Sequence, residues 1–277
     1  YIQYPYYTSI DFYVLHNNKK IKERKTGNFE LIRNREVDHQ FFYFNLNLKK
    51  DKTYDIFIRI TKVGRIILPI SILSPKGFTK ENRFTYTLFG SYYGFLIIII
   101  MYHLLIFFSL KEINYFYYAI YILAALFSTL PFSGFGYLYL WDSNPFIHHL
   151  SPFLFSPPNL ISLLIFTRHF LQIKKYSKRL NSIFLLLIIV LLFELVSYFT
   201  LGLSDGLTAL ANLLNSIVLI INYIAAIVVY RKGFKPAKFY LIGWSVYSVG
   251  LISFNLFFLN VIPFSIVTQY ALFAGST

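Results

Sequence analysis

Residues 174–238 read KKYSKRLNSIFLLLIIVLLFELVSYFTLGLSDGLTALANLLNSIVLIINYIAAIVVYRKGFKPAK, which is two long apolar segments between two basic clusters. The short connection between these segments carries Asp205 as its single charged residue. Each segment is long enough for a helix to cross a hydrocarbon core of about 30 Å. Because Lys and Arg concentrate on the cytoplasmic side of membrane proteins, the pattern predicts two spans whose basic ends lie inside the cell.

The same alternation extends over the whole chain after residue 85. Every Lys and Arg there lies in alternate connections or at the adjoining end of a span, and the other connections carry Asp142 and Asp205. The basic residues are Lys111, Arg168, Lys174, Lys175, Lys178, Arg179, Arg231, Lys232, Lys235 and Lys238. We therefore expect a seven-span α-helical membrane bundle in residues 86–277, with residues 1–85 outside the membrane. The expected spans are 88–110, 115–140, 153–173, 180–201, 207–230, 239–260 and 263 onward.

The sequence is expected to be a fragment. It begins at Tyr1 without an initiator Met or a signal peptide. Its last apolar run, from Pro263 to Thr277, is shorter than the roughly 20 residues that a span needs. We expect the seventh span to be truncated and the outer domain to be incomplete at its N-terminus.

The composition agrees with a membrane protein. Hydrophobic residues make up 56% of the chain and charged residues 14%, whereas a typical soluble domain has about 25% charged residues. The net charge is +14, but no basic run is long enough to form a continuous stripe, so a nucleic-acid partner is not expected. The absence of cysteine excludes disulfides and cysteine-ligated metals.

Residues 1–85, the outer domain, alternate apolar and polar side chains with the period of two that is typical of β-strands. We expect about five strands in an all-β sandwich that has lost part of its sheet. The expected strands are residues 11–16, 28–33, 42–48, 54–60 and 66–72, and the expected turns are residues 17–19 and 62–64.

Four residues of the outer domain are candidates for ligand binding: Tyr43, Asn45, Asn47 and Arg59. They lie on the polar faces of the predicted strands. An aromatic ring beside hydrogen-bonding groups suits a sugar, which offers apolar faces and hydroxyl edges. The alternative is that Tyr43 packs inside the sandwich or against membrane-proximal loops.

A second candidate site lies inside the predicted spans, where polar side chains are costly. Counted from the outer ends of the spans, polar residues from five spans fall at a similar depth, in the outer third of the bundle. They are Asn159, Glu194, Asn212, Asn215, Asn255 and Gln269. This polar layer either holds the bundle together by interhelical hydrogen bonds or forms a small pocket or relay, with Glu194 protonated or hydrogen bonded.

The histidines near the spans have simpler interpretations. His148 and His149 are adjacent, do not share a helix face and have no third ligand nearby in sequence, so we expect a solvated interface loop rather than a metal site. His103 is expected to be a hydrogen-bonded core histidine, and Arg168 is expected to extend to the inner interface.

Prolines and missing motifs complete the prediction. Pro131 and the Pro pair at 157–158 are expected to kink or locally unwind the second and third spans. The sequence contains no zinc-protease motif, nucleophile elbow or phosphate loop. No enzymatic activity, cofactor or metal is therefore expected for these residues.

Short stretches along the whole chain, in order, resemble one known family. In the outer domain they are SIDFY (9–13), TG (26–27), Arg35, QFFYF (40–44), YDIFIRI (54–60) and GRIILPISI (64–72). In the spans they are GSYYG (90–94), YFYY (115–118), GFG (134–136), YLW (139–141), Phe166, Arg168, Phe170, Leu171, AKFYLIGW (237–244) and YALFAGS (270–276). The chain is similar to the bacterial seven-transmembrane receptors with diverse intracellular signalling modules. It departs from them at Asp142, where the family often has Pro.

The resemblance implies a sensor. Such receptors carry an extracellular jelly-roll domain suspected of binding carbohydrate-like ligands, then seven spans and a cytoplasmic histidine kinase, diguanylate cyclase or PP2C-type phosphatase. The implied partners are membrane lipid, a small-molecule or carbohydrate-like ligand and an output module in the same chain, with a homodimer as one assembly to test. The implied location is the bacterial inner membrane. Two other classes remain open here: a transporter or channel-like carrier with an outer accessory domain, and a membrane-embedded transferase.

Overall fold

The computed structural model describes residues 1–62 and 68–245. These residues divide into two compact units. The first unit contains residues 1–86, 127–156 and 197–210, and the second contains residues 87–126, 157–196 and the described residues from 211 on. The first unit therefore joins the outer domain to one set of helix ends, whereas the second is built from helices.

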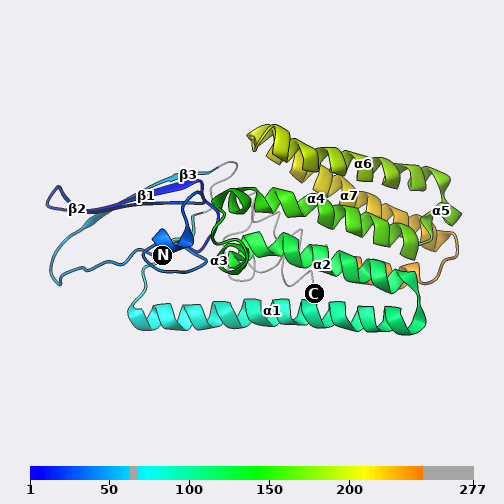
Figure 1. Ribbon diagram of the computed structural model, residues 1–277, viewed down its shortest axis with the longest axis horizontal. Helices are drawn as coiled ribbons and strands as arrows, with labels where there is room; N and C mark the ends of the chain where they lie inside the picture. Colours follow the sequence, from blue (N-terminus) through cyan, green and yellow to red (C-terminus); the bar gives the residue numbers. More distant parts are fainter. Residues whose placement is uncertain (63–67, 246–277) are drawn as a thin grey trace. The chain divides into compact units, whose positions relative to one another are not determined.

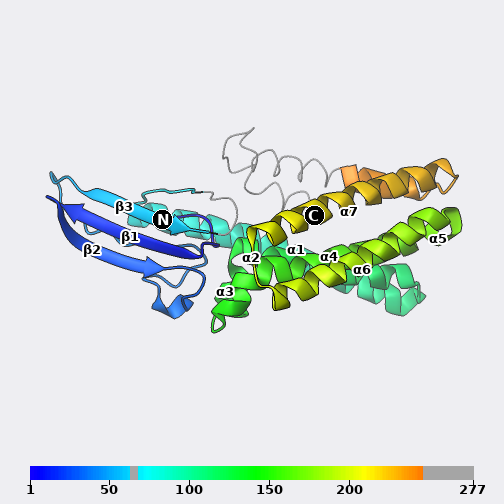
Figure 2. The ribbon, with the colours of Figure 1, turned by 90° about the horizontal axis from the view of Figure 1, so that it is seen from above.

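Three antiparallel strands form the sheet of the outer domain: β1 (Ser9–His16), β2 (Lys19–Thr26) and β3 (Asp55–Thr61). Strand β1 lies between the other two, as Figure 2 shows for the strands that Figure 1 labels. The turn between β1 and β2 consists of Asn17 and Asn18, whose φ angles are 51° and 59°. Two positive φ values in a two-residue loop are typical of a type I′ turn, and Asn tolerates them better than most residues. The predicted turn at 17–19 is confirmed.

One face of this sheet is the core of the outer domain. Ile10, Phe12 and Val14 of β1 are buried on that face. The segment after residue 41 covers it: Phe42 belongs to the same apolar cluster as Ile10, and the Phe44 ring stacks on Phe12 with centroids 4.2 Å apart. This packing holds the segment beside the sheet, where the pockets described below form.

The expectation of about five strands is only partly correct. The predicted strands at 11–16 and 54–60 are β1 and β3. Residues 28–33 instead form a loop that runs into a short 3-10 helix, Ile32–Asn34. Residues 42–48 alternate in burial only between residues 44 and 47, and the one bridge that they form with a described residue is between Phe42 and Ile2. The predicted strand at 66–72 lies partly outside the described residues, and its described part, residues 68–72, forms a bridge between Ile70 and Ile2 instead of a strand.

Strand β2 is missing from the predicted strands because its sequence, KKIKERKT, has no apolar alternation. It lies at the edge of the three-stranded sheet, with most of its residues exposed. Charged side chains are common on edge strands, because they discourage pairing with another chain. Pairing with β1, rather than burial of its own side chains, makes this segment a strand.

Five helices of the described part are long and apolar enough to cross a membrane. They are α1 (Pro75–Leu110), α2 (Ile113–Ser133), α4 (Pro145–Phe170), α6 (Lys178–Thr200) and α7 (Asp205–Arg231). The short helices α3 (Phe135–Tyr139) and α5 (Ile173–Tyr176) lie in connections, and residues 237–245 begin a further helix. The first five predicted spans correspond to the long helices. The sixth is described only to residue 245, and the seventh lies outside the described residues.

Prolines affect the second and third predicted spans differently. The second, residues 115–140, is not one helix: α2 ends just after Pro131, and Gly134 has a φ of 76° before α3 begins. Glycine suits this left-handed conformation, and a Cβ there would lie only 2.9 Å from the Gln40 carbonyl oxygen. In contrast, α4 stays helical through the Pro pair at 157–158, so of the predicted kink or local unwinding of the third span the unwinding is wrong and the kink stays a prediction.

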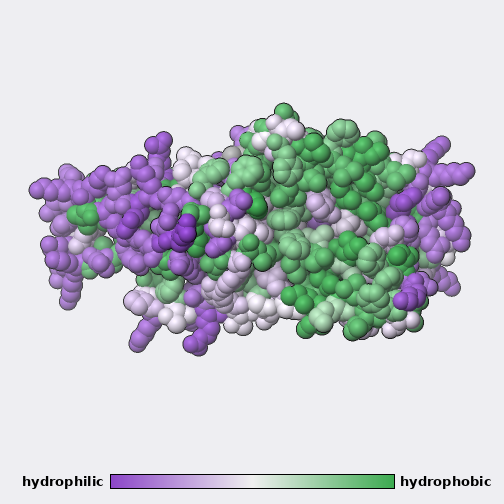
Figure 3. All heavy atoms as spheres, viewed as in Figure 1, coloured by the Kyte–Doolittle hydropathy of each residue, from purple (hydrophilic) through white to green (hydrophobic). Residues whose placement is uncertain are grey.

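Large apolar side chains cover the helices of the second unit (Figure 3). On α1, Ile98, Leu105 and Phe108 are more than half exposed, and so is Phe193 on α6. A contiguous apolar surface of this kind is unfavourable in water and favourable against lipid. The helices α4, α6 and α7 pack together around a separate buried cluster that includes Leu164, Phe184 and Val218.

The basic connections of the second unit lie together at one end of its helices. The turn that carries Lys111, the α5 segment and the C-terminal end of α7 are all at that end (Figure 1 and Figure 2). The presence of Lys and Arg in alternate connections predicts this arrangement, because loops on one side of a membrane must meet at one end of the bundle.

Candidate sensor pocket and its junction with the helices

The outer domain contains a pocket between the end of β2, the loop after it and the segment at 42–44. Its volume is about 320 Å³, and we refer to it as the Arg35 pocket. The residues that line it are Glu23, Arg24, Lys25, Thr26, Glu30, Asn34, Arg35, Glu36, Phe42, Tyr43 and Phe44. Charged, hydroxyl and aromatic side chains thus meet in one small cavity.

Arg35 is the most unusual residue of this pocket. Its guanidinium lies over the rings of Phe42 and Tyr137, with Cζ 4.2 Å and 5.3 Å from the two centroids. Nη1 donates a hydrogen bond to the His39 carbonyl oxygen, whereas Nε and Nη2 are buried without a hydrogen-bond partner among the described residues. Burial lowers the pKa of Arg35 to about 10, although Tyr137 and nearby carboxylates act in the opposite direction. The cation–π contacts offset part of the cost of this burial.

The acidic side chains Glu36 and Glu23 of the pocket are held by basic neighbours. Glu36 lies 2.7 Å from Lys22 Nζ and 3.0 Å from Arg24 Nε, and it accepts a hydrogen bond from the Asn45 backbone N–H. Burial alone would raise the pKa of Glu36, but these hydrogen bonds outweigh it and the net shift is downward. Lys20 and Lys25 pair with Glu23 in the same way. Glu36 and Glu23 therefore remain ionised and compensated.

A second pocket adjoins the first and contains two of the predicted ligand-binding residues. Asn45 and Asn47 line it together with Lys22 and Glu36, and its volume is about 540 Å³. The structure thus brings Asn45 and Asn47 together and places Tyr43 in the neighbouring Arg35 pocket.

Arg59 and Tyr43 differ in how they fit the predicted ligand site. Arg59 is exposed and alternates with the inward-facing Ile58 and Ile60 of β3, so it lies on the other face of the sheet and is not part of either pocket. The Tyr43 ring stacks on Tyr1 with centroids 4.9 Å apart. Tyr43 therefore both packs and lines a pocket, and the two interpretations of this residue are compatible.

The outer domain packs directly on helix ends within the first unit. The Tyr137 hydroxyl of α3 donates a hydrogen bond to the Glu30 carbonyl oxygen, and the Tyr137 ring stacks on His148 of α4 with centroids 3.9 Å apart. Tyr6 makes an edge contact with His148 and stacks on His149. We call these five residues the junction.

The junction overturns the predicted solvated loop at His148. Helix α4 begins at Pro145, earlier than the predicted start of the third span, and His148 is only 1% exposed. Its burial depends on Tyr6 and Tyr137, which are distant in sequence, so no local pattern could predict it. The described residues contain no group of three metal-ligating side chains.

A second contact joins the pocket region to the outer end of α1. His39 Nδ1 accepts a hydrogen bond from the Phe41 backbone N–H, so in the neutral ring Nε2 donates to Asn82 Oδ1, at 2.8 Å. Burial lowers the pKa of His39, although the bond to Asn82 opposes this, and the neutral form is favoured. The Tyr43 ring makes an edge contact with His39, with centroids 4.6 Å apart. Tyr43 thus connects the pocket to α1.

The predicted polar layer is described in part. Glu194 is buried on α6, with 5% of its surface exposed. Asn159 Oδ1 is buried and accepts no hydrogen bond from the described residues, and Asn212 is exposed on α7. Asn215 is half-buried on the same helix. Asn255 and Gln269 lie outside the described residues, so the layer stays a prediction.

A buried polar network that includes none of the predicted site residues lies elsewhere in the second unit. The Tyr240 hydroxyl is 2.7 Å from Thr167 Oγ1 and donates to Asn222 Oδ1 at 3.4 Å. Asn222 Nδ2 donates back to the Val218 carbonyl oxygen. Asn222 follows the buried positions 214 and 218 at helical spacing, so the periodicity of α7 could have indicated it.

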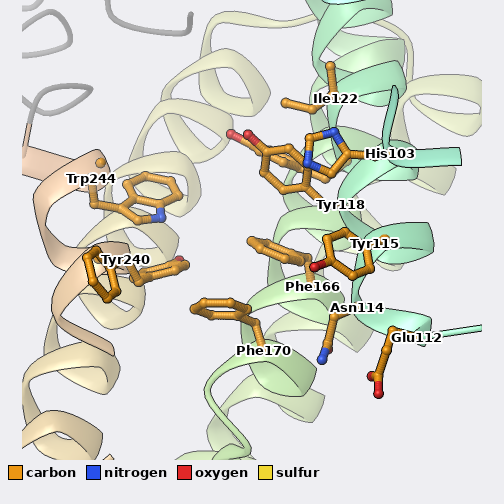
Figure 4. Close-up of a pocket in the computed structure, with 13 residues that line it drawn as sticks. His103, Glu112, Asn114, Tyr115, Tyr118, Ile122, Phe166, Phe170, Tyr240 and Trp244 are labelled. Atoms are coloured by element: carbon orange, nitrogen blue, oxygen red, sulfur yellow. The ribbon is translucent and has the colours of Figure 1, made fainter. Parts of the chain in front are cut away.

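Aromatic rings surround a cavity of about 560 Å³ in the second unit (Figure 4). Tyr118 and Phe166 lie across it from Tyr240 and Trp244. His103 lies at its wall, and its Nδ1 is 2.8 Å from the Ile99 carbonyl oxygen. The predicted hydrogen bond of His103 is confirmed, but the residue is half-buried and not a core histidine.

Comparison with known families assigns both parts of the chain. A family model described as 7TM diverse intracellular signalling matches residues 85–277, and one described as 7TMR-DISM extracellular 2 matches residues 1–74. The chain belongs to the 7TM diverse intracellular signalling family. The resemblance inferred from short motifs is therefore confirmed. No curated protein and no solved structure gives a significant match.

Family membership makes this chain a multi-pass membrane receptor with an extracellular sensor domain. The two models together cover most of its length, and neither describes a catalytic domain. The receptor's two pockets and the junction thus belong to its extracellular part and the helix ends packed on it.

Proposed function

We propose that this receptor binds a small carbohydrate-like ligand in its outer domain and passes the signal through its helices to a cytoplasmic signalling module. The observation that carries the proposal is the junction, in which the Tyr137 hydroxyl donates a hydrogen bond to the Glu30 carbonyl oxygen of the outer domain and the His148 ring packs on Tyr6. A change in the outer domain must disturb these buried contacts, because close-packed groups do not deform continuously.

The chemistry of the two adjoining pockets supports a sugar. Glu30, Asn34 and Thr26 offer acceptors and donors to hydroxyl groups, and Tyr43 offers an aromatic face. Asn45 and Asn47 add amides in the second pocket. A sugar presents both hydroxyl edges and apolar faces, so it can satisfy these groups together.

Continuous helices support the transmission step. Helix α4 begins with the junction residue His148 in its first turns and continues without a break to Phe170. Helix α1 begins outside the expected span and carries Asn82, the partner of His39. A rigid helix transmits a shift at one end to the other, so α1 and α4 are the elements that connect the sensor to the cytoplasmic side.

The family assignment favours a receptor over the transporter or the transferase that the sequence left open. We infer that the basic connections face the cytoplasm of a bacterial cell and that the protein resides in the inner membrane. Its partners are then lipid, the ligand and an output module of the same chain.

Ligand binding is tested on the purified full-length receptor in lipid nanodiscs. A ligand at 100 times its Kd should stabilise the protein by about 2.7 kcal/mol, so a panel of neutral and acidic mono- and disaccharides is screened for an increase in Tm. At least one sugar should raise Tm in a concentration-dependent way and change the activity of the output module. A panel without any stabilising sugar would contradict the proposed ligand class.

A further inference from the structure

We propose that the Arg35 pocket binds the carboxylate of an acidic sugar and that Arg35 reports this binding to the helix ends through Tyr137. The inference rests on the proposed function. It adds the charge of the ligand and the residue that detects it.

Arg35 has hydrogen-bond donors that its surroundings do not use. Nη1 donates to the His39 carbonyl oxygen at 3.1 Å, but Nε and Nη2 are buried and bond to none of the described residues. A buried donor without a partner is costly, and the cost is greater when the group is charged. Nε and Nη2 form one edge of the guanidinium plane, and this edge matches the two oxygens of a carboxylate.

The ion pairs of the pocket also leave Arg35 without a close carboxylate, so an anion fits beside it. Glu23 and Glu36 are paired with neighbouring Lys and Arg side chains. Arg35 forms no ion pair with a described residue, and Glu30 and Asp38 act on it only through longer-range attraction. The pocket therefore offers one guanidinium whose charge no close carboxylate compensates.

The rest of the pocket suits a sugar ring attached to that carboxylate. Thr26 Oγ1 is buried and has no hydrogen-bond partner in the described part of the chain. The Glu30 side chain and the Tyr43 ring line the same cavity of about 320 Å³. A hydroxyl of the ligand can bond to Thr26 and Glu30 while the carboxylate bonds to Arg35.

Arg35 contacts both the pocket and α3. Its guanidinium lies 5.3 Å from the centroid of the Tyr137 ring, and Nε and Nη2 are covered in this structure. A carboxylate can reach these nitrogens only if the guanidinium turns toward the pocket, which weakens its contact with Tyr137. Tyr137 stacks on His148, so the change reaches the first turns of α4.

Matched ligands test the charge of the preferred sugar on the intact receptor in nanodiscs. D-Glucuronate should bind about 10- to 100-fold more tightly than D-glucose or the neutral methyl ester of glucuronate, as expected for a charge-assisted bidentate pair. Lactate, a carboxylate without a sugar ring, should bind more weakly than glucuronate. Equal affinity for glucuronate and its methyl ester would overturn the inference while leaving the proposed sugar sensor intact. Failure of every sugar would instead overturn the proposed function.

Variants test whether Arg35 is the residue that recognises the carboxylate of the ligand. Arg35→Gln should lose the preference for glucuronate over its methyl ester and retain affinity for the neutral sugars. Arg35→Lys should keep a reduced preference, because an ammonium group lacks the planar fork. Arg33→Gln is the matched control: Arg33 is exposed, lies close in sequence and does not line the pocket. Equal losses for charged and neutral sugars in Arg35→Gln would show a merely structural role.

The fluorescence of Trp141 tests the link to the helix ends. The chain has two tryptophans, and Trp244→Phe leaves only Trp141, whose ring lies against Gly136 of α3. Saturating glucuronate should change its emission in this background, and the change should disappear in the double variant with Arg35→Gln. An identical emission change with the methyl ester at saturation would show that the signal does not pass through Arg35.

Discussion

Lys62 is a lysine of the outer domain whose charged form is disfavoured by burial. Its Nζ donates to the Tyr4 hydroxyl at 2.9 Å and lies 4.3 Å from the centroid of the Tyr4 ring. Burial lowers the pKa of Lys62 to about 8. Burial also raises the pKa of Tyr4, so the phenol stays neutral beside it. The folded protein thus holds this ammonium less favourably than the unfolded chain does.

We expect the free energy of unfolding of the wild type to increase with pH relative to that of Lys62→Met. Between about pH 8 and 10 the unfolded chain binds more protons at residue 62 than the folded protein does, so this group makes unfolding costlier by at most about 1.4 kcal/mol per pH unit. Lys62→Met has no titrating side chain at this position, so it lacks this pH-dependent contribution to stability. Tm measured from pH 7 to 10 should therefore rise for the wild type relative to Lys62→Met.

The exposed Lys52 provides the control for this comparison. Lys52→Met should follow the wild-type curve, because the Lys52 side chain is exposed and the substitution leaves Lys62 in place. Parallel pH curves for the wild type and Lys62→Met would show that Lys62 is not destabilised when charged.

For single residues, the sequence predicted an environment only where that environment depends on near neighbours in the chain. The hydrogen-bonded state of His103 follows from its place within an apolar span and is confirmed. The burial of His148 does not follow from its neighbours, because Tyr6 and Tyr137 reach it from distant segments. Arg35 stands in a polar stretch, and its burial likewise depends on packing by Phe42 and Tyr137. Long-range packing of this kind leaves no local pattern.

Among the elements, helix α7 is linked to α4 and to the segment at 237–245 by the Tyr240 hydroxyl. Tyr240→Phe removes that hydroxyl and keeps the ring, so Thr167 and Asn222 lose a shared partner. We expect a loss of about 0.6–2 kcal/mol, as for other interhelical hydrogen bonds in membranes, seen as a lower Tm in nanodiscs. Tyr230→Phe, which changes an exposed tyrosine of α7, should leave Tm unchanged. Equal Tm values for the two variants would show that the network does not stabilise the bundle.

Helix α6 carries the predicted polar layer through Glu194. A charged Glu in a span is costly, so the side chain is expected to be neutral or well hydrogen bonded. Glu194→Gln keeps the hydrogen-bonding capacity and should leave both Tm and the dose response of the output module unchanged. Glu194→Leu should lower Tm, because a leucine side chain cannot make the hydrogen bonds of a buried carboxyl group. If Glu194→Gln fixes the output in one state while Tm is retained, the layer relays the signal.

The elements that the sequence predicted well are those with a strong local pattern. Length and apolarity indicate the long helices, and the period of two indicates strands β1 and β3. Strand β2 is an edge strand without apolar alternation, and it depends on pairing with β1. The segment at 42–48 has the strand pattern without a ladder, because it covers the face of the sheet with Phe42 and Phe44 instead of joining its edge.

For the whole molecule, the chemistry of the membrane makes the sequence more informative than it is for a soluble protein. A span needs only length and apolarity, and its orientation needs only the position of Lys and Arg. Neither depends on which helices touch. The sensor pocket is the opposite case, because it is assembled from residues between 23 and 44 that meet only after the sheet has formed. The membrane class was therefore predictable, the topology stays a prediction, and of the residues that line the Arg35 pocket the sequence indicated only Tyr43 as a ligand-binding candidate.

The orientation of the receptor in the membrane can be tested directly by labelling single cysteines. Ser143 lies in the exposed connection between α3 and α4, and Lys175 lies in the exposed connection between α4 and α6. The chain has no cysteine, so Ser143→Cys and Lys175→Cys each introduce a single thiol. A membrane-impermeant maleimide added to intact cells should label Cys at position 143 and not at 175.

Ser177, beside Lys175, gives a second inner position with a different local role. Ser177 Oγ accepts a hydrogen bond from the Leu180 backbone N–H at the start of α6, so Ser177→Cys should weaken a helix cap but keep its side of the membrane. It should react only after the membrane is made permeable, as Lys175→Cys does. Labelling of all three positions in intact cells would place the basic connections outside. The Lys and Arg of the alternate connections would then not set the orientation. In that case the continuous helices α1 and α4 could not carry a signal from the outer domain to the cytoplasm.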